Sequence, residues 1–213
     1  AGFVNIRLAD GTAVVVDNYA TVPLRATPDL YDADLNSIDH VVAGDVNATG
    51  HLAVAVGGTI KGWALAIEKY GRLSLAEVAA PAIRFARQGY RVSPYLHESI
   101  RSNRERLERS PDSAKVFLPG GAVPAAGDRI SRPEYGDTLE VIGRKGPDYL
   151  YHGPLGAAIV DDMAANGGLI TQADLDSYRV YERPPASGKA FGVEISAPPP
   201  PSSGGAHIVQ ILK

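Results

Sequence analysis

The side chains that most often carry chemistry are scattered along this sequence of 213 residues. It has no cysteine, which excludes structural disulfides, a thiolate nucleophile and zinc–thiolate sites. The histidines show neither the His-x3-His nor the His-Glu-x2-His spacing of metal sites; they are His40, His51, His97, His152 and His207. Asp161 and Asp162 are adjacent in an expected helix, where neighbouring side chains diverge by about 100°. The sequence therefore predicts no metal site, no cofactor site and no shared carboxylate pair.

Two further patterns resemble anion-binding sites only superficially. Gly57-Gly58-Thr59 lacks the Gly-Lys-Thr/Ser ending of a phosphate loop. Between residues 98 and 109, four arginines interleave with three glutamates at helical spacing, which indicates a solvated, self-paired helix face. The formal net charge is -3, with both signs interspersed, so the chain offers no single-sign surface to a nucleic acid or an anionic membrane. No apolar run approaches the ~20 residues of a membrane span.

Size and composition predict one domain spanning residues 1–213. With 45% hydrophobic residues, a chain of this length can bury roughly 70% of its unfolded surface in one core. No signal peptide stands at the N-terminus, and Ala1-Gly2-Phe3 already belongs to an expected strand, so we expect the true start to be absent. A cysteine-free protein is stable in either redox compartment, so cysteine usage leaves the location open.

The elements that must position any site begin with a β-hairpin. Residues 4–8 and 12–16 are strand-like and flank Asp10-Gly11, which predicts a two-residue turn. The second strand is almost continuously apolar, as expected for a central strand covered on both faces. Residues 27–52 then predict an irregular connection with turns at Gly44-Asp45 and Thr49-Gly50.

Helical signals dominate residues 62–178. The start and stop signals are a capping box at Ser74 and Glu77, a stop at Gly89, Ser93 before Pro94, Asp137 with Glu140, and Gly153-Pro154 ended by Asn166-Gly167. Pro81 interrupts the pattern that starts at Ser74, so we expect a kink or two short helices there. Residues 191–196 alternate with period two and predict a strand that returns the chain to the sheet. We expect both terminal regions to join one sheet, with residues 62–178 packed against it as helices.

Residues 198–205 are expected to form a corner, a sharp change of chain direction before a helix. Four prolines at 198–201 predict an extended arm without backbone donors. Ser202 or Ser203 can cap the helix that follows, and Gly204 and Gly205 remove side chains where the backbone must approach something closely. We therefore expect these four residues to be structural and to lie near a site.

This corner and several other motifs resemble the large subunit of the γ-glutamyltransferases, a family of N-terminal-nucleophile hydrolases. The resemblance covers nearly all of residues 2–212, in the family's order and spacing. It rests on the motifs Gly57–Trp63, Pro81–Tyr90, Leu150–Gly153, Asn166–Thr171, Ala173–Leu175 with Tyr178, Glu182–Pro184 and Pro198–Leu212. It implies an α+β fold, namely an αββα sandwich to which this chain supplies part of the sheets and most of the helices. It also implies glutathione or related γ-glutamyl chemistry without a cofactor.

The same resemblance places the nucleophile outside this chain. Such hydrolases use a Thr, Ser or Cys whose own freed α-amino group is the base, and Ala1 cannot serve. In the family the nucleophilic threonine begins a small subunit cut from the same precursor, so we expect that subunit and a small-molecule amide as partners. No catalytic residue is expected in this chain. The resemblance also suggests a periplasmic or secreted enzyme, with a cytoplasmic location as the alternative.

One substrate-binding position departs from the family pattern. The family carries Asp-aromatic-Arg-Glu shortly before Ala-Pro, with the arginine binding the substrate α-carboxylate through its guanidinium fork. Here the aligned residues are Asp17-Asn18-Tyr19-Ala20, so Tyr19 replaces the arginine and Ala20 the glutamate. Arg25 is a second candidate for the carboxylate, although a surface arginine is the commoner interpretation.

Two functional hypotheses remain open on these residues. The first is an enzyme subunit that cleaves an amide through an acyl-enzyme, with glutathione, a β-lactam side chain or a small amide as competing substrates. The second is a non-catalytic relative that keeps the fold for binding or assembly, since a fold does not by itself imply an activity. A threonine at the N-terminus of the partner chain would distinguish them.

Overall fold

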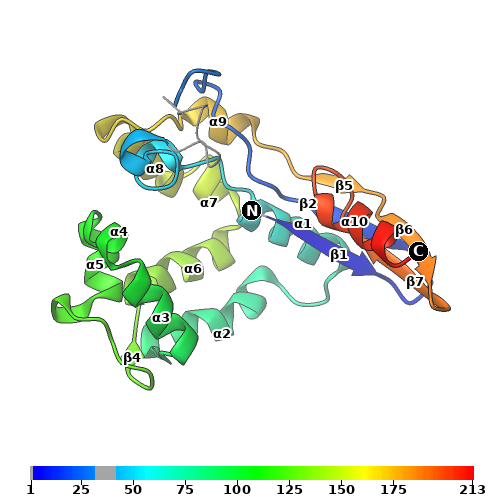
Figure 1. Ribbon diagram of the computed structural model, residues 1–213, viewed down its shortest axis with the longest axis horizontal. Coiled ribbons are helices and arrows are strands. Elements are labelled where there is room, and N and C mark those ends of the chain that lie inside the picture. Colours follow the sequence, from blue (N-terminus) through cyan, green and yellow to red (C-terminus); the bar gives the residue numbers. More distant parts are fainter. Residues whose placement is uncertain (1, 32–41) are drawn as a thin grey trace.

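The chain is a mixed α and β structure with much more helix than strand. The computed structural model describes residues 2–31 and 42–213, so His40 lies outside the described residues. Strands β1 (Phe3–Arg7), β2 (Ala13–Asp17) and β5 (Tyr181–Arg183) form an antiparallel sheet in the order β1-β2-β5. Figure 1 shows this sheet on one side of the molecule and most of the helices on the other.

The expected hairpin is present, but its turn is longer than predicted. Arg7 pairs with Ala13, and the Leu8 N–H donates to the Thr12 carbonyl over 2.8 Å. The loop therefore contains three residues rather than two. Gly11 adopts a φ of 91°, and its N–H donates to the Leu8 carbonyl over 3.0 Å. This is the three-residue solution in which one glycine supplies the left-handed position.

Strand β2 occupies the central position that its apolar sequence predicts. Val15 and Val16 are fully buried, and Asp17 at the end of the strand is 5% exposed. A strand covered on both faces can be apolar throughout because neither face meets water.

The C-terminal strands form a hairpin of their own, which corrects the prediction that residues 191–196 join the first sheet. Strand β6 (Ala186–Ala190) pairs with β7 (Val193–Ala197), and helix α10 (Ser203–Ile211) packs on both. Side chains rather than a backbone ladder link this hairpin to β1. Asn5 donates to the Ser196 carbonyl over 2.8 Å, and Arg7 pairs with Glu194 at 3.2 Å.

The middle of the chain is helical, as predicted. The helices are α1 (Thr59–Tyr70), α2 (Leu75–Gln88), α3 (Pro94–Ser102), α4 (Arg104–Glu108), α5 (Pro111–Phe117), α6 (Pro133–Lys145), α7 (Asp148–Tyr151), α8 (Pro154–Ala165) and α9 (Gln172–Ser177). Short 3-10 turns at Ala43–Asp45, His51–Ala53 and Pro119–Gly121, and a two-strand pair of β3 (Tyr90–Arg91) with β4 (Arg129–Ile130), lie between them.

Most of the predicted helix ends are confirmed, and one is wrong. Ser93 caps α3 through the Leu96 N–H, and α8 starts at Pro154 and ends before Asn166. Asp137, however, is not a cap. Helix α6 already starts at Pro133, because a proline at the first position sacrifices no hydrogen bond. Asp137 instead accepts hydrogen bonds from Arg87 of α2.

Helix α2 runs through Pro81 as one element of 14 residues, so the expected division into two short helices is wrong. A proline inside a helix removes one intrahelical hydrogen bond. Here the packing of α2 against α6 outweighs that loss. Gly136 of α6 has no side chain, which allows the two helices to approach closely.

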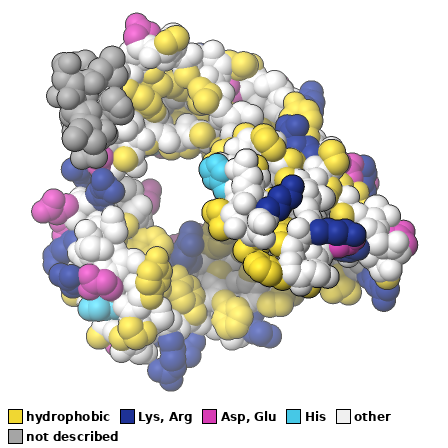
Figure 2. Space-filling view, turned by 45° about the vertical axis from the view of Figure 1, so that its right-hand side comes forward, with side chains coloured by type: hydrophobic (Ala, Val, Ile, Leu, Met, Phe, Trp, Pro, Cys, Tyr) yellow, Lys and Arg dark blue, Asp and Glu magenta, His cyan; other side chains and the backbone are white. Residues whose placement is uncertain are grey.

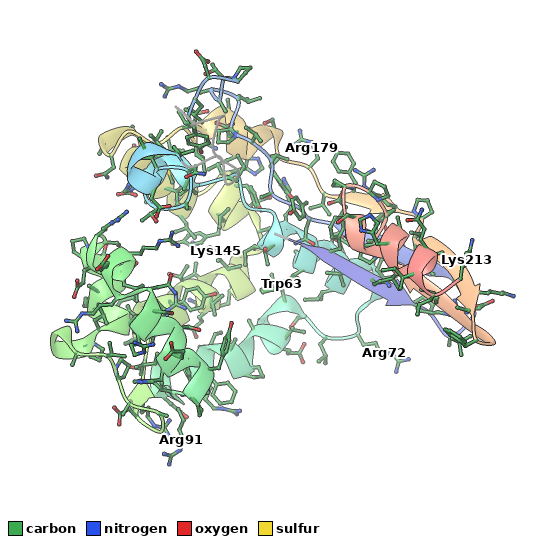
Figure 3. The ribbon with its side chains drawn as sticks, viewed as in Figure 1. Trp63, Arg72, Arg91, Lys145, Arg179 and Lys213 are labelled. Atoms are coloured by element: carbon green, nitrogen blue, oxygen red, sulfur yellow. The ribbon has the colours of Figure 1, made fainter. Side chains whose placement is uncertain are left out.

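Among the described helices of the middle of the chain, α1 packs on strands β1 and β2 of the first sheet. Helix α2 packs instead against α6, and α7 packs against α8. This corrects the expectation that the whole helical middle packs against one sheet. Figure 2 shows the result as a molecule hollowed through its middle. Figure 3 places Arg91 at the tip of the helical region and Lys213 beside the C-terminal hairpin, at opposite ends.

The main buried cluster joins the helical region to the start of α1. Its members are Val56, Tyr151, Met163, Ile170, Leu175 and Tyr178. None of the helices in the described ranges has the length and apolarity needed to cross a bilayer.

The arginines between residues 98 and 109 are paired, as predicted, but not only with their own helix. Arg101 pairs with Glu98 and Arg104 with Glu108. Arg106 and Arg109 instead reach Asp45, at 3.0 and 3.9 Å. The pattern is therefore a solvated face that also anchors the connection before α1.

Replacing Ser74 with alanine is expected to lower the free energy of unfolding by about 1 kcal/mol, because the capping box of α2 is lost. The Ser74 Oγ accepts from the Glu77 N–H at 3.3 Å, and the Glu77 carboxylate accepts from the Ser74 N–H at 2.8 Å. Urea unfolding would measure the change. The control is Ser102→Ala, which removes an exposed hydroxyl that donates back to the Glu98 and Ser99 carbonyls of its own helix and caps no helix N-terminus. Its effect should stay within about 0.5 kcal/mol.

The same capping interaction should depend on pH. Hydrogen bonds from the Ser74 side chain and backbone hold the pKa of Glu77 below its usual value. A carboxylate with a lowered folded-state pKa stabilises above its unfolded pKa, and its contribution disappears as the pH falls through the folded pKa. An effect of Ser74→Ala that is as large in acid, with Glu77 protonated, as at neutral pH would contradict this assignment.

Candidate functional site

The backbone around Tyr19 is held by the side chain of Asp17. One carboxylate oxygen, Oδ1, accepts the Tyr19 N–H at 3.0 Å, the hydrogen bond of an Asx turn. The other oxygen, Oδ2, accepts from the Nε of Arg183 at 2.7 Å. A carboxylate that is 5% exposed needs such partners. Asp17 therefore fixes the direction in which the chain leaves β2.

Tyr178 holds the same residue from its other side. Its hydroxyl donates to the Tyr19 carbonyl at 2.9 Å. Burial, followed by the negative charge of Asp17, raises the pKa of Tyr178 to about 12. The phenol therefore keeps its proton, and thus its donor, at any physiological pH. Both backbone polar groups of Tyr19 are therefore bonded to side chains, the N–H to Asp17 in the same turn and the carbonyl to the distant Tyr178.

Two glycines of helix α1 make room for this arrangement. A Cβ atom at Gly58 would lie 1.6 Å from the Tyr178 hydroxyl oxygen and 2.6 Å from the Asn18 carbonyl oxygen. A Cβ atom at Gly62 would lie 2.4 Å from the Asn18 Cβ. The backbone after β2 therefore rests directly on the first turns of α1, a close approach that only glycine permits.

Helix α9 anchors the segment that follows Tyr19. Asp174 caps α9 by accepting from Thr171, and its other oxygen accepts the Leu24 N–H at 2.6 Å. Burial alone would raise the pKa of Asp174, but the hydrogen bonds from Thr171 and Leu24 outweigh it and the pKa lies below its usual value. Thr21 and Val56 also exchange backbone hydrogen bonds, at 2.9 and 3.1 Å. The segment from Tyr19 to Leu24 is thus bound to the fold at several points.

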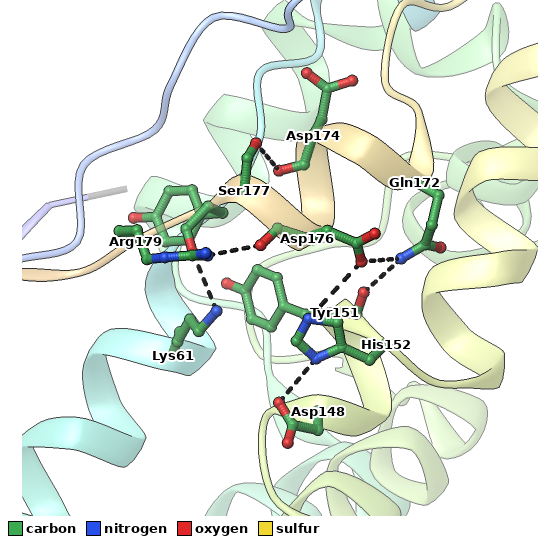
Figure 4. A network of polar contacts seen from close by, with 10 residues as sticks. Lys61, Asp148, Tyr151, His152, Gln172, Asp174, Asp176, Ser177 and Arg179 are labelled. Atoms are coloured by element: carbon green, nitrogen blue, oxygen red, sulfur yellow. Dashed lines mark hydrogen bonds and ion pairs between the residues drawn. The ribbon is translucent and has the colours of Figure 1, made fainter.

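A network beneath α9 supports Tyr178 (Figure 4). The Tyr178 ring stacks on Tyr151 with 5.7 Å between centroids, and Lys61 donates to the Tyr178 carbonyl at 3.1 Å while lying over the Tyr151 ring. Burial, and then the nearby Arg179, lower the pKa of Lys61. Tyr151 donates to the Gly57 carbonyl at 2.7 Å, which ties the network to the start of α1.

The Tyr19 side chain itself points outward. It is 51% exposed, and its ring lies 5.5 Å from the ring of Phe3. It presents one hydroxyl, which can donate one hydrogen bond, where a guanidinium would present five donors. Ala20 is half-buried and presents no polar group. This corner can therefore accommodate a neutral or singly hydrogen-bonded group, but it does not supply a positive charge.

Arg25, the second predicted carboxylate ligand, is exposed just beyond the anchored Leu24. Within residues 2–31 and 42–213, no hydrogen bond or ion pair joins it to another side chain. It remains a predicted ligand, and a surface arginine fits its exposure.

The C-terminal corner has the predicted helix, but the expected extended proline arm is wrong in part, because the Ser202 N–H donates to the Pro199 carbonyl at 3.0 Å and closes a turn. Ser202 stands at the N-cap position of α10, although its side chain makes no capping hydrogen bond. A Cβ atom at Gly205 would lie 2.1 Å from the Pro198 carbonyl oxygen, whereas Gly204 has open space around it. The close approach therefore belongs to Gly205. No described hydrogen bond or ring contact connects Ser202, Ser203, Gly204 or Gly205 with Tyr19.

Three of the described histidines have ordinary partners. His51 contacts Asp162 at 3.0 Å, His152 contacts Asp148 at 3.1 Å, and His97 contacts the Pro124 carbonyl at 2.8 Å. Across the described ranges no three His, Cys, Asp or Glu side chains converge as metal ligands would.

Sequence patterns alone did not identify Asp17, Tyr178, Asp174 and Arg183 as the residues that position Tyr19. Tyr178 and Arg183 do occur in the motifs that carry the family resemblance, and Asp174 lies in Ala173–Leu175. Tyr178 contacts Tyr19, Asp174 contacts Leu24 and Arg183 contacts Asp17, each across 150 or more residues of sequence. No local pattern records such contacts.

Comparison with known proteins identifies the group to which these features belong. The profile of the gamma-glutamyltranspeptidase family matches residues 1–213. The chain belongs to this family.

Three relatives of this chain illustrate the range of the family. The acylase ACY 1 proenzyme of Pseudomonas sp. strain V22 is 46% identical over 99% of this chain and 38% of its own length. The glutathione hydrolase proenzyme of Escherichia coli K12 is 37% identical over 99% of this chain and 36% of its own length. The crystal structure of Helicobacter pylori gamma-glutamyltranspeptidase superposes with a TM-score of 0.90 at 35% identity, over 99% of this chain and 60% of the other. The chain thus spans under two fifths of those curated relatives.

Proposed function

We propose that this chain is the non-nucleophilic part of an amidohydrolase that removes acyl groups lacking the α-amino acid head of a γ-glutamyl group. A threonine at the start of a small subunit from the same precursor attacks the amide carbonyl through its hydroxyl. Its own α-amine takes the proton and passes it to the leaving amine. Water, or an amine acceptor, then releases the acyl group from the ester intermediate.

The single observation that carries the substrate class is Tyr19 in the position of the family's carboxylate-binding arginine. A guanidinium fork binds a carboxylate through two charge-assisted hydrogen bonds, and a phenol offers one neutral donor. Each lost hydrogen bond to a charged group weakens binding by about 1.5–3 kcal/mol. The backbone of Tyr19 is held at both its N–H and its carbonyl, so the loop does not need to rearrange to present the phenol.

The comparisons support the same choice. The acylase proenzyme shares 46% of its aligned residues with this chain, and the glutathione hydrolase proenzyme 37%. We therefore favour an acylase over glutathione hydrolysis. Hydrolysis of γ-glutamyl compounds is the second candidate, supported by Arg25, which is exposed six residues after Tyr19 and free to reach a carboxylate.

An exposed apolar surface supports the partner chain, in addition to the family relationship. Large apolar side chains are exposed on β7, α10 and the turn before β7; they are Phe191, Val193, Ile208, Ile211 and Leu212. Exposed apolar groups in one region mark a surface that another chain or segment covers. We infer that the rest of the enzyme covers it and completes an αββα sandwich, and we retain a periplasmic or secreted location as part of the proposal.

N-terminal sequencing and intact-mass analysis of the complete enzyme test the reaction class. We expect a second chain that begins with threonine. We also expect a larger kcat/KM for a simple acyl anilide without a carboxylate than for a γ-glutamyl anilide, and no turnover when that threonine is replaced by alanine.

Each contrary outcome identifies which part of the proposal is wrong. A partner chain without an N-terminal threonine, together with no anilide hydrolysis, would establish the non-catalytic relative. A preference for the γ-glutamyl anilide would keep the enzyme but reject the acylase assignment.

A further inference from the structure

We propose that Arg183 is a positioning residue for substrate selection, which acts through Asp17 on Tyr19. The proposal rests on the proposed function, because it assumes that Tyr19 faces the acyl group. It adds a residue that does not touch the substrate and lies more than 160 positions away in the sequence from the residue it controls.

The two carboxylate oxygens of Asp17 bind two different partners. Oδ2 binds the Arg183 Nε at 2.7 Å, and Oδ1 binds the Tyr19 N–H at 3.0 Å. A rotation of the carboxylate that improves one contact degrades the other. The Asp17 side chain is 6% exposed, so no bulk water replaces a lost partner, and its orientation depends on Arg183.

Strand pairing brings Arg183 to this face of the sheet. Val15 is directly opposite Arg183, and Asp17 is opposite Tyr181. Side chains two positions apart on a strand share a face, so Asp17, Tyr181 and Arg183 all project to the same side. The Arg183 guanidinium lies over the Tyr181 ring, 5.2 Å from its centroid, an arrangement that holds the planar group in place.

The opposite face of β5 is tied to α1. Glu182 accepts hydrogen bonds from Lys69 and Tyr70 near the end of α1. These bonds hold the register of β5, and the register places Arg183 beside Asp17. Gly58 at the N-cap of α1 and Gly62 within it lie against Asn18, the residue before Tyr19. The helix and the strand therefore together locate the Tyr19 segment.

A loss of Arg183 should therefore move Tyr19 without removing any group that reacts. Small displacements of a positioned group lower the binding of the groups that contact it. We expect Arg183→Gln to reduce the ratio of kcat/KM between a glutaryl anilide and an unsubstituted acyl anilide by about five-fold, a coupling of ordinary size for neighbouring residues. The change should appear in KM rather than in kcat.

The test uses the complete two-subunit enzyme with a matched control. Arg101→Gln removes an arginine of the exposed pair with Glu98 on α3, and it should leave the ratio unchanged. Arg183→Lys keeps a positive charge beside the buried carboxylate, so it retains the fold if Arg183→Gln does not mature. It lacks the stacked planar group and should still lower the ratio by about two-fold.

A double-mutant cycle with Tyr19→Ala separates this proposal from the proposed function. In the Tyr19→Ala background, Arg183→Gln should change the ratio no further, because its effect passes through Tyr19. An unchanged ratio in the native background, equal losses on both substrates through kcat, or the same change in both backgrounds would overturn the role of Arg183. If Tyr19→Ala alone leaves the ratio as it was, Tyr19 is not the selecting residue and the proposed function fails on its own account.

Discussion

Replacing Tyr19 with arginine and Ala20 with glutamate is expected to increase kcat/KM for a γ-glutamyl anilide about ten-fold or more relative to a simple acyl anilide that has no carboxylate. The arginine supplies two charge-assisted donors for the substrate α-carboxylate, of about 1.5–3 kcal/mol each. Each 1.4 kcal/mol corresponds to about a ten-fold change in binding. The exposure of Tyr19 and its bonded backbone mean that the new side chain can extend outward without disturbing the core.

A control separates the position from the added charge. Tyr95 on α3 is 83% exposed and lies in the helical region, so Tyr95→Arg adds the same residue away from the corner. It should leave the selectivity unchanged. If the native enzyme already prefers the γ-glutamyl anilide and the Tyr19→Arg, Ala20→Glu variant gains nothing, then Arg25 or a small-subunit residue binds the carboxylate.

Replacing Gly58 with alanine is expected to lower the free energy of unfolding by about 3 kcal/mol or more, the upper range for overpacking a rigid site. The added Cβ would lie 1.6 Å from the hydroxyl oxygen of Tyr178 and 2.3 Å from its Cζ. Tyr178 is 2% exposed and stacked on Tyr151, so its ring has no free space into which it can rotate. Relief of the clash must therefore displace the packed ring and break its hydrogen bond to the Tyr19 carbonyl.

The neighbouring glycine provides the control. Gly57 has no atom within 4 Å of a Cβ built on it, so Gly57→Ala should change the free energy of unfolding by no more than about 0.5 kcal/mol. Urea unfolding of the mature enzyme measures both variants. Similar stabilities for Gly57→Ala and Gly58→Ala would show that Tyr178 does not rest on Gly58 in the way described.

Local rules predicted the elements that depend on neighbouring residues. The capping box at Ser74, the Ser93–Pro94 start of α3 and the Pro154 start of α8 were all confirmed. Their determinants lie within one helical turn, where a side chain can reach an unpaired N–H. The turn at Asp10-Gly11 was predicted at the correct position, but its loop has three residues rather than two.

The errors occurred where distant contacts outweigh local preference. Pro81 predicts a kink or two short helices, and the second alternative is wrong because α2 continues through Pro81 while it packs along α6. Asp137 looks like a cap, but in the fold it faces Arg87. The strand at 191–196 was predicted to return to the first sheet, but β7 pairs with β6 and reaches β1 only through side chains.

The sequence by itself determined the family resemblance and the presence of Tyr19 and Ala20 where that resemblance leads us to expect an arginine and a glutamate. Those conclusions need only residue identities and their order. Only the tertiary structure showed that Asp17, Tyr178 and Arg183 hold Tyr19 in place, since these contacts depend on the register of β5 against β2 and on the close approach of α1. Pairing register and interhelical approach arise from the packing of the whole chain, and the residues that meet there carry no local pattern that records their partners.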